Sequence, residues 1–236
     1  MDRYGLPNDY VTNPEVTVST APGQIYWTPR RIALSGLYQS HVYRWAAELV
    51  SRQALRRVLD VGCGPATKLN RMIAPLAETV VGVDQASAIE YCQKTHQHGA
   101  YFVDDFAHPT FEDREPFDLI ICCDVVEHLE DPDSLLGYLR SFGNSSSLYL
   151  ISTPAREKLR GENVRFSANP AHVREWSTNE FLWYLAQHGF VVRESRLLPP
   201  IAVWPPSLVS LRLALRQLPV GKHWRHNHAV LCTLKN

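Results

Sequence analysis

Short apolar runs alternate with stretches of helical periodicity along most of this 236-residue chain. The apolar runs predict strands at 57–62, 80–84, 100–103, 117–123, 147–153, 190–197 and 228–235. Apolar residues at helical spacing predict helices at 36–55, 66–77, 86–97, 132–142 and 178–188. Because strand and helix alternate, we expect βαβ units and an α/β fold. A doubly wound, mostly parallel seven-stranded sheet would then carry helices on both faces.

The two ends of the chain depart from this alternation. The first 35 residues contain four prolines and show little periodicity, which predicts an N-terminal arm or lid over 1–35. The remaining residues, 36–236, are expected to form the main domain, since one domain takes roughly 150 residues. Five prolines frame residues 199–220 as an insertion between the last two strands.

The charge balance, the length of the apolar runs and the cysteine spacing each exclude a class of protein. Lys plus Arg and Asp plus Glu each number 24, so the net charge is zero, which argues against affinity driven by a global basic field. No apolar run approaches the ~20 residues that span a bilayer, and the first residues lack a signal peptide's apolar stretch. The five cysteines include no C-x-x-C pair, which disfavours a disulfide framework or a zinc site. We therefore expect a cytoplasmic protein with free thiols.

The glycine-rich stretch after the first predicted strand carries the densest chemical signal. Gly62 and Gly64 lie where the strand turns into a helix, and their missing Cβ atoms let a ligand approach the backbone. The dinucleotide pattern G-x-G-x-x-G is incomplete, because Thr67 occupies its third glycine position. A carboxylate at Asp60, just before the glycines, suits a cationic ligand group better than a pyrophosphate.

Carboxylates also end the next two predicted strands. Asp84 follows Gly64 by 20 residues, where a carboxylate can accept hydrogen bonds from both hydroxyls of a ribose. Asp105 ends the third strand and is placed to meet a base, although its neighbour Asp104 offers the same group.

Taken in order, LDVGCGPATKL, VVGVDQ, VDDF, FDLIICCDVVEHLEDP and LYLISTP resemble the class I S-adenosylmethionine-dependent methyltransferases, over about residues 40–195. The resemblance implies a Rossmann-like methyltransferase fold. It also implies donor-binding roles for Asp60 (ammonium), Gly62 and Gly64 (methionine part), Asp84 (ribose), Asp105 and Phe106 (adenine), Cys123 (methionine part) and Gln85.

The segment after the fourth predicted strand suggests a second site. Asp124, Glu127 and His128 lie within one turn, and His172 follows in a later loop. Two carboxylates and two imidazoles are a candidate divalent-metal site, for which we expect Mg²⁺. A purely structural role for Glu127 and His128 is an equally weighted alternative.

This segment, with the stretch from Ser152 to Thr178, is similar to two groups of methyltransferases. One group methylates hydroxyls of sugars and glycans, and the other the 3′-terminal 2′-hydroxyl of small RNAs. The chain departs from the RNA group because Asp124 replaces a Glu and a basic surplus is missing. We therefore expect methyl transfer to a hydroxyl of a sugar, oligosaccharide or small polar metabolite, with a nucleic-acid substrate disfavoured. An idle, methyltransferase-like interaction module and an NAD-dependent oxidoreductase are weaker alternatives.

Two routes for activating that hydroxyl stay open. His128 or His172 would act as general base, or a metal would lower the pKa of the hydroxyl. Tyr26 and Trp27 are expected to close over the donor or the acceptor, or simply to anchor the arm. The apolar helical stripe within 199–220 predicts a cover on the acceptor pocket or a homodimer contact, ahead of a membrane-surface helix.

Overall fold

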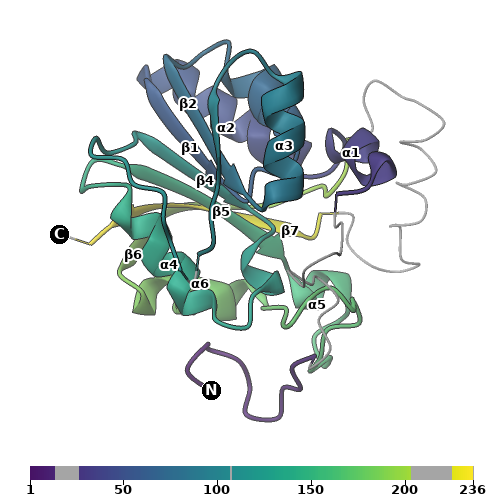
Figure 1. The fold of residues 1–236 in the computed structure, drawn as a ribbon. Coiled ribbons are helices and arrows are strands. Elements are labelled where there is room, and N and C mark those ends of the chain that lie inside the picture. The colour runs from purple at the N-terminus through teal and green to yellow at the C-terminus, as the bar shows by residue number, and fades with distance from the viewer. Residues whose placement is uncertain (14–26, 107, 203–224, 236) are drawn as a thin grey trace.

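A single seven-stranded sheet organises the protein (Figure 1), in a computed structural model that describes residues 1–13, 27–106, 108–202 and 225–235. The strand order is β3-β2-β1-β4-β5-β7-β6, and only β7 runs antiparallel to its neighbours. The strands are β1 (Arg57–Val61), β2 (Thr79–Asp84), β3 (Ala100–Val103), β4 (Leu119–Cys123), β5 (Leu148–Pro154), β6 (Phe190–Leu198) and β7 (Asn227–Leu234). The predicted α/β fold with a mostly parallel seven-stranded sheet is confirmed.

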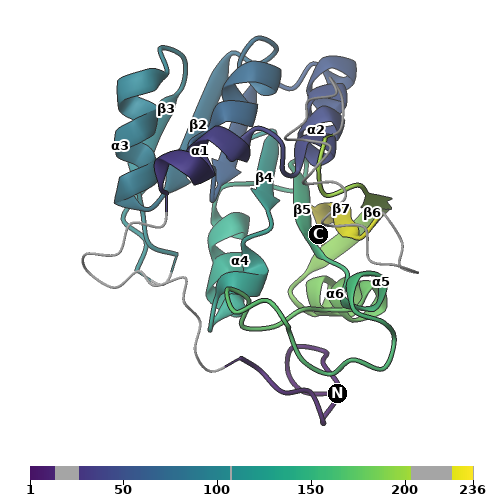
Figure 2. The ribbon, with the colours of Figure 1, turned by 90° about the vertical axis from the view of Figure 1, so that its right-hand side faces the viewer.

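Helices cover both faces of the sheet. The helices are α1 (Pro29–Ser35), α2 (Ser40–Gln53), α3 (Ala86–Thr95), α4 (Pro132–Ser141), α5 (Arg156–Leu159) and α6 (Thr178–Gln187). Figures 1 and 2 show α2 and α3 on one face and α4 and α6 on the other. In the described part of the chain, no helix is long and apolar enough to cross a membrane.

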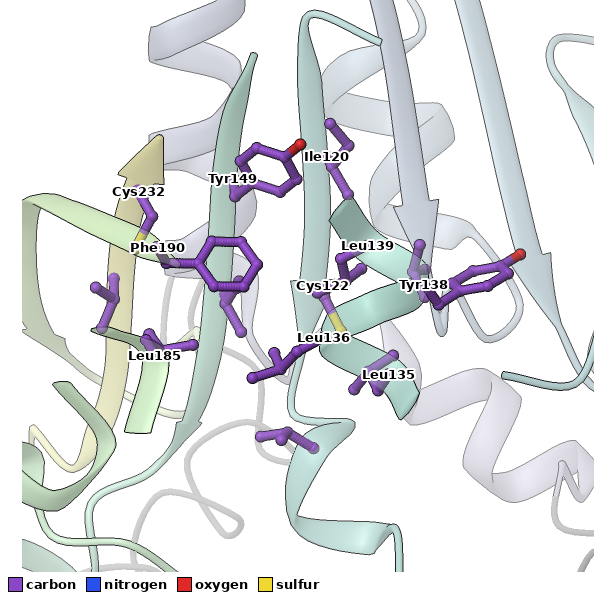
Figure 3. Close-up of a cluster of buried hydrophobic side chains, with 14 of the residues drawn as sticks. Ile120, Cys122, Leu135, Leu136, Tyr138, Leu139, Tyr149, Leu185, Phe190 and Cys232 are labelled. Atoms are coloured by element: carbon purple, nitrogen blue, oxygen red, sulfur yellow. The ribbon is translucent and has the colours of Figure 1, made fainter. Parts of the chain in front are cut away.

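The central strands are buried on both faces, because their side chains point alternately to either layer of helices. Val58 of β1 packs with the α2 layer, and its neighbour Leu59 packs with the α4 and α6 layer. Figure 3 shows the second cluster, to which α4 contributes Leu136, α6 contributes Leu185 and β4 contributes Cys122. All five cysteines are free and buried.

Two helix predictions need correction. The predicted helix at 66–77 holds only a short α-helical start before a π-helical turn at Leu69–Ile73, where the Ala74 N–H donates to the Leu69 carbonyl. The helix predicted from residue 36 begins at Ser40, because Gln39 takes a left-handed φ of 51°. Long-range pairing accounts for this start: the Gln39 N–H donates to the Pro200 carbonyl at 3.0 Å.

The N-terminal residues 1–13 lie on the α4 and α6 side of the sheet (Figure 2). Leu6 is fully buried there, and the Tyr4 carbonyl accepts a hydrogen bond from the Trp176 indole at 2.9 Å. Val11 pairs with Phe166 in an isolated bridge. This part of the predicted arm is therefore packed on the domain.

Several predictions concern residues outside the described part of the chain. They include Tyr26 and most of the 199–220 insertion, of which the structure describes the segment up to Ala202. Within that segment, Ile201 is buried and pairs with Tyr38 in an isolated antiparallel bridge. The cytoplasmic location and the homodimer stay predictions.

Candidate active site

A cavity of about 1300 Å³ opens where β1, β2 and β4 end. The strand order reverses between β1 and β4, and open α/β sheets bind ligands at such switch points. Residues from α1, α5 and the loop before α6 complete its wall. The cavity therefore brings together segments that lie far apart in the sequence.

A tight turn after β1 forms the floor of the cavity. Gly62 and Gly64 have φ values of +74° and +56°, which favour glycine. The N–H groups of Gly62 and Cys63 donate to the Val83 carbonyl at 2.9 and 3.2 Å, so β2 holds the turn in place. A Cβ atom on Gly62 would overlap the Val125 side chain.

Asp84 is buried at the end of β2 and points back to this turn. Its carboxylate accepts hydrogen bonds from the Gly64 N–H at 2.8 Å and from the N–H of the next residue, Gln85, at 2.7 Å. Burial raises the pKa of Asp84 to about 6, although both N–H groups favour the ionised form. The arrangement presents a fixed carboxylate to the cavity.

Asp60 and Lys68 place opposite charges in one buried region. The Tyr43 hydroxyl donates to Oδ2 of Asp60 at 2.7 Å, whereas Oδ1 has no hydrogen-bond partner among the described residues. Burial raises the pKa of Asp60 to about 7. Lys68 donates to the Ser35 carbonyl at 2.9 Å and to Oε1 of Gln39 at 3.2 Å, and burial lowers its pKa.

The two aspartates after β3 have different surroundings. Asp104 accepts hydrogen bonds from the Thr110 N–H at 2.7 Å and the Tyr138 hydroxyl at 2.6 Å, which ties it to the following loop. Asp105 is exposed and lines the cavity beside Phe106, whose ring packs 5.2 Å from that of Tyr138. These contacts favour Asp105 over Asp104 for binding a ligand.

Three other residues predicted to bind donor or substrate also line the cavity: Gln85, Cys123 and Trp27. Cys123 ends β4 and is buried. The Trp27 indole lies over Gly64, where an added Cβ atom would come within 2.6 Å of the ring. Trp27 therefore lies on the side of the predicted donor site.

Asp124 lies at the centre of a polar network. It has a left-handed φ of 53°, and its carboxylate accepts hydrogen bonds from Ser152 at 2.6 Å, Asn227 at 2.8 and 3.0 Å, and Gln39 at 3.0 Å. These bonds join the residue before α2 to β5 and β7 in the wall of the cavity. The carboxylate of Asp124 does not belong to the group of potential ligand atoms that Glu127, His128 and His172 form, and its role as a metal ligand stays a prediction.

Glu127, His128 and His172 offer ligand atoms that all lie within 4.8 Å of one another. Burial, together with the charge of Asp124, raises the pKa of Glu127 well above its ordinary value. Its Oε2 accepts a hydrogen bond from Thr153 at 3.0 Å, but its Oε1 has no partner among the described residues. A buried unpaired carboxylate oxygen is costly, and a cation beside it would remove that cost.

Hydrogen bonds orient both imidazoles. Nδ1 of His128 donates to the Ala171 carbonyl at 2.6 Å, which leaves Nε2 with its lone pair. Nδ1 of His172 lies 2.8 Å from a Glu175 carboxylate oxygen, and its Nε2 lies 2.8 Å from the amide nitrogen of Asn169. Metal-binding histidines typically have one nitrogen bonded in this way.

Sequence reasoning missed several polar residues of the cavity. Lys68 follows Thr67 in the quoted motif, but a lysine at that position offers no sign that it points inward. Gln39 and Asn227 come from distant segments, and only the fold brings them to Asp124.

Comparison with known proteins agrees with this architecture. Residues 38–195 match the model of a methyltransferase-domain family. The ubiquinone biosynthesis O-methyltransferase of Bradyrhizobium sp. (strain ORS 278) is 28% identical over 218 residues, covering 82% of this chain and 86% of that protein. The small RNA 2′-O-methyltransferase of Mus musculus is 29% identical over 165 residues, which cover 59% of this chain but 39% of the mouse protein.

A solved structure shares the fold at low sequence identity. It is an S-adenosylmethionine-dependent methyltransferase from Clostridium acetobutylicum, with a TM-score of 0.60 and 12% identity, covering 84% of this chain and 92% of the other. The match to the family model begins just before α2, ends within β6 and includes the whole glycine-rich turn. The chain belongs to the class I S-adenosylmethionine-dependent methyltransferases.

Proposed function

We propose that the protein methylates a hydroxyl of a small polar metabolite that carries two neighbouring hydroxyls, with the help of a divalent cation. One observation carries the proposal. The cluster of Glu127, His128 and His172 lies in the wall of the same cavity as the glycine-rich turn and Asp84. A cation held there would lie beside the donor.

The residues of the cavity fit S-adenosylmethionine. Asp84 lines the cavity and offers both oxygens to the ribose hydroxyls. Among the described residues, Asp60 is fully buried, is not part of the lining and leaves Oδ1 unpaired, so the charge of its carboxylate would attract the donor's ammonium group from behind the lining. Gly62 and Gly64 line the cavity with backbone alone, and the Trp27 ring covers Gly64. When bound, the donor supplies an activated methyl group on a sulfonium, so the chain's own residues mainly bind and orient.

The ligand atoms of the cluster amend the expectation of Mg²⁺. That expectation included Asp124 and an oxygen-rich site, whereas the cluster offers two imidazoles and one carboxylate. Imidazole suits transition metals, and Mg²⁺ favours oxygen ligands. We therefore propose an ion such as Mn²⁺, held by Glu127 and by Nε2 of both histidines.

Metal assistance accounts for the site better than a histidine base does. Burial and the neighbouring His172 lower the pKa of His128 to about 4. An imidazole with this pKa is neutral at pH 7 but is a weak base. A divalent cation lowers the pKa of a bound hydroxyl and holds two oxygens of a diol at once. His128 then acts as a ligand.

The relatives favour oxygen as the acceptor atom, because both reported relatives are named O-methyltransferases. Neither name mentions a saccharide, so the proposed acceptor class covers any small vicinal diol, sugars included. A small RNA with a 3′-terminal diol is the second candidate, which the mouse relative favours. RNA ranks second because the chain has no net positive charge to attract the phosphate backbone.

The test is methyl transfer from labelled S-adenosylmethionine to paired acceptors. Each pair is a vicinal diol and its mono-hydroxyl analogue: catechol with phenol, a cis-diol sugar with its deoxy form, and a short RNA with its 3′-deoxy form. We expect Mn²⁺-dependent methylation of a small diol, lost with EDTA and in Glu127→Gln. Equal methylation of the mono-hydroxyl analogues, undiminished by EDTA, would overturn the proposal. Methylation of RNA alone would favour the second candidate.

A further inference from the structure

Glu175 is a fully buried carboxylate just outside the candidate metal cluster. We propose that Glu175 is a positioning residue, which binds Nδ1 of His172 and so leaves Nε2 as the nitrogen that a cation in the cluster would take. The inference rests on the proposed metal-assisted function and assigns a further residue to that site.

The hydrogen bonds of His172 define which nitrogen carries the proton. The Ala171 N–H donates to Oδ1 of Asn169 at 3.0 Å, which turns the amide nitrogen of Asn169 toward Nε2 of His172. An amide nitrogen donates, so Nε2 accepts. Nδ1 then carries the hydrogen and donates to Glu175 at 2.8 Å. This tautomer leaves the lone pair of Nε2 available to a cation that displaces the amide.

Glu175 is itself held from several sides. Arg160 donates to both of its carboxylate oxygens at 3.2 Å. The Tyr10 hydroxyl accepts its backbone N–H at 2.8 Å, and Arg156 donates to its carbonyl at 2.5 Å. A carboxylate fixed at this many points cannot follow a rotation of the imidazole, so it defines the plane of the ring.

Glu175 supports the cluster without being one of its ligands. Both of its oxygens are engaged by Arg160 and His172, and the group of potential ligand atoms contains Glu127, His128 and His172 only, among the described residues. A carboxylate behind a metal-binding histidine typically sets its orientation and raises its basicity as a ligand. Removing such a partner commonly weakens metal binding by about 10- to 100-fold.

The N-terminal residues reach the site through the backbone around Glu175. Tyr10 contacts Glu175, and the Asn13 N–H donates to the Val173 carbonyl at 2.9 Å, one residue after His172. Residues 1–13 thus hold the loop that carries the histidine. Tyr10→Phe keeps the ring but removes the oxygen that accepts the Glu175 N–H, so it provides a milder second variant.

The experiment compares the full-length wild type with Glu175→Gln, Tyr10→Phe and the control Glu157→Gln. Glu157 is a carboxylate that accepts hydrogen bonds from Thr178 and lies outside the cluster. Titration calorimetry measures Mn²⁺ affinity in the presence of S-adenosylhomocysteine. Long-range ¹⁵N–¹H correlation spectra, recorded without metal, report the tautomer of His172. Affinity for S-adenosylhomocysteine serves as the folding control.

We expect Glu175→Gln to weaken Mn²⁺ binding by about 10- to 100-fold and to shift His172 away from the Nδ1–H tautomer. Tyr10→Phe should weaken binding by a smaller factor, and Glu157→Gln should leave it within about twofold. Unchanged affinity and tautomer in Glu175→Gln would overturn the positioning role but not the proposed function. Absence of Mn²⁺ binding in the wild type would contradict the proposed function. The tautomer spectra would then decide alone whether Glu175 fixes His172.

Discussion

The rings of His128 and His172 lie edge to face, with centroids 4.8 Å apart and planes at 83°. His128 ends the short 3-10 turn at Val126–His128, and His172 belongs to the loop before α6. The Glu127 carbonyl accepts the Val173 N–H at 2.8 Å, which joins these two segments directly. The relative position of the two rings therefore depends on this backbone hydrogen bond as well as on the contact between the imidazoles.

Replacing Asp84 should abolish most donor binding. Asp84→Ala removes two charged acceptors for the ribose and the bond that holds the Gly64 N–H. Hydrogen bonds to a charged group contribute about 1.5–3 kcal/mol each, so we expect the Kd for S-adenosylhomocysteine to rise about 100-fold or more. Calorimetry measures this Kd, with the exposed Glu90→Ala as control. Undiminished binding by Asp84→Ala would contradict the ribose assignment.

The turn at Gly62 should tolerate no side chain. Gly62→Ala adds a Cβ atom that overlaps Val125 and forces alanine to a φ of +74°. We expect a loss of about 1–3 kcal/mol in the free energy of unfolding, seen as a lower melting temperature. Adding Val125→Ala to this variant should recover part of that loss relative to Val125→Ala alone. A double variant with fully additive losses would argue against the clash.

Metal binding should release a proton from Glu127. Burial raises the pKa of Glu127 well above its ordinary value, so the metal-free carboxyl keeps its proton to higher pH than an exposed glutamate does. A cation requires the ionised form, and its affinity should therefore rise by up to about tenfold per pH unit below that pKa. Calorimetry with Mn²⁺ in buffers of different ionisation enthalpy counts the released protons. We expect about one for the wild type and none for Glu127→Gln, whereas an equal count in both would exclude Glu127 as the source.

Donor binding should weaken as the pH falls. Burial raises the pKa of Asp84 to about 6, so the carboxylate that we propose accepts the ribose hydroxyls is protonated below this pH. We expect the affinity for S-adenosylhomocysteine to be nearly constant above about pH 8. Below pH 6 it should fall by about tenfold per unit or more, since binding then has to remove a proton from Asp84 and also from Asp60, whose pKa burial raises to about 7. A flat profile between pH 5 and 8 would contradict this role of the ionised Asp84.

The parts of the fold that depend on neighbours in sequence were predictable. The strand ends at Asp84 and Cys123 and the turn at Gly62 follow from short apolar runs and from glycine. The structure departs from the predicted elements where segments that are distant in the sequence meet. Residues 37–39 bond to 200–202, which delays the start of α2 and places Gln39 against Asp124.

In the candidate metal cluster, too, local spacing predicts some features and long-range contacts determine the others. The spacing of Glu127 and His128 after β4 predicts their shared position, and both lie in the cluster. Asp124 was included for the same reason, but its left-handed backbone and its bonds to Ser152 and Asn227 hold it in another network. Those partners come from β5 and β7, and local spacing contains no information about them.

Thermal unfolding of the S-adenosylhomocysteine-bound protein during a Mn²⁺ titration tests directly whether Glu127, His128 and His172 hold a cation. A ligand that binds only the folded state stabilises it by about 2.7 kcal/mol at 100 times its Kd, or roughly 5–10 °C for a chain of this size. We expect such a rise with S-adenosylhomocysteine and Mn²⁺ in the wild type and in the exposed-site control His98→Ala, because both keep Glu127, His128 and His172. We expect no rise with EDTA or in His128→Ala. An equal rise in His128→Ala, or no rise in the wild type even with a vicinal diol present, would contradict the proposed metal site.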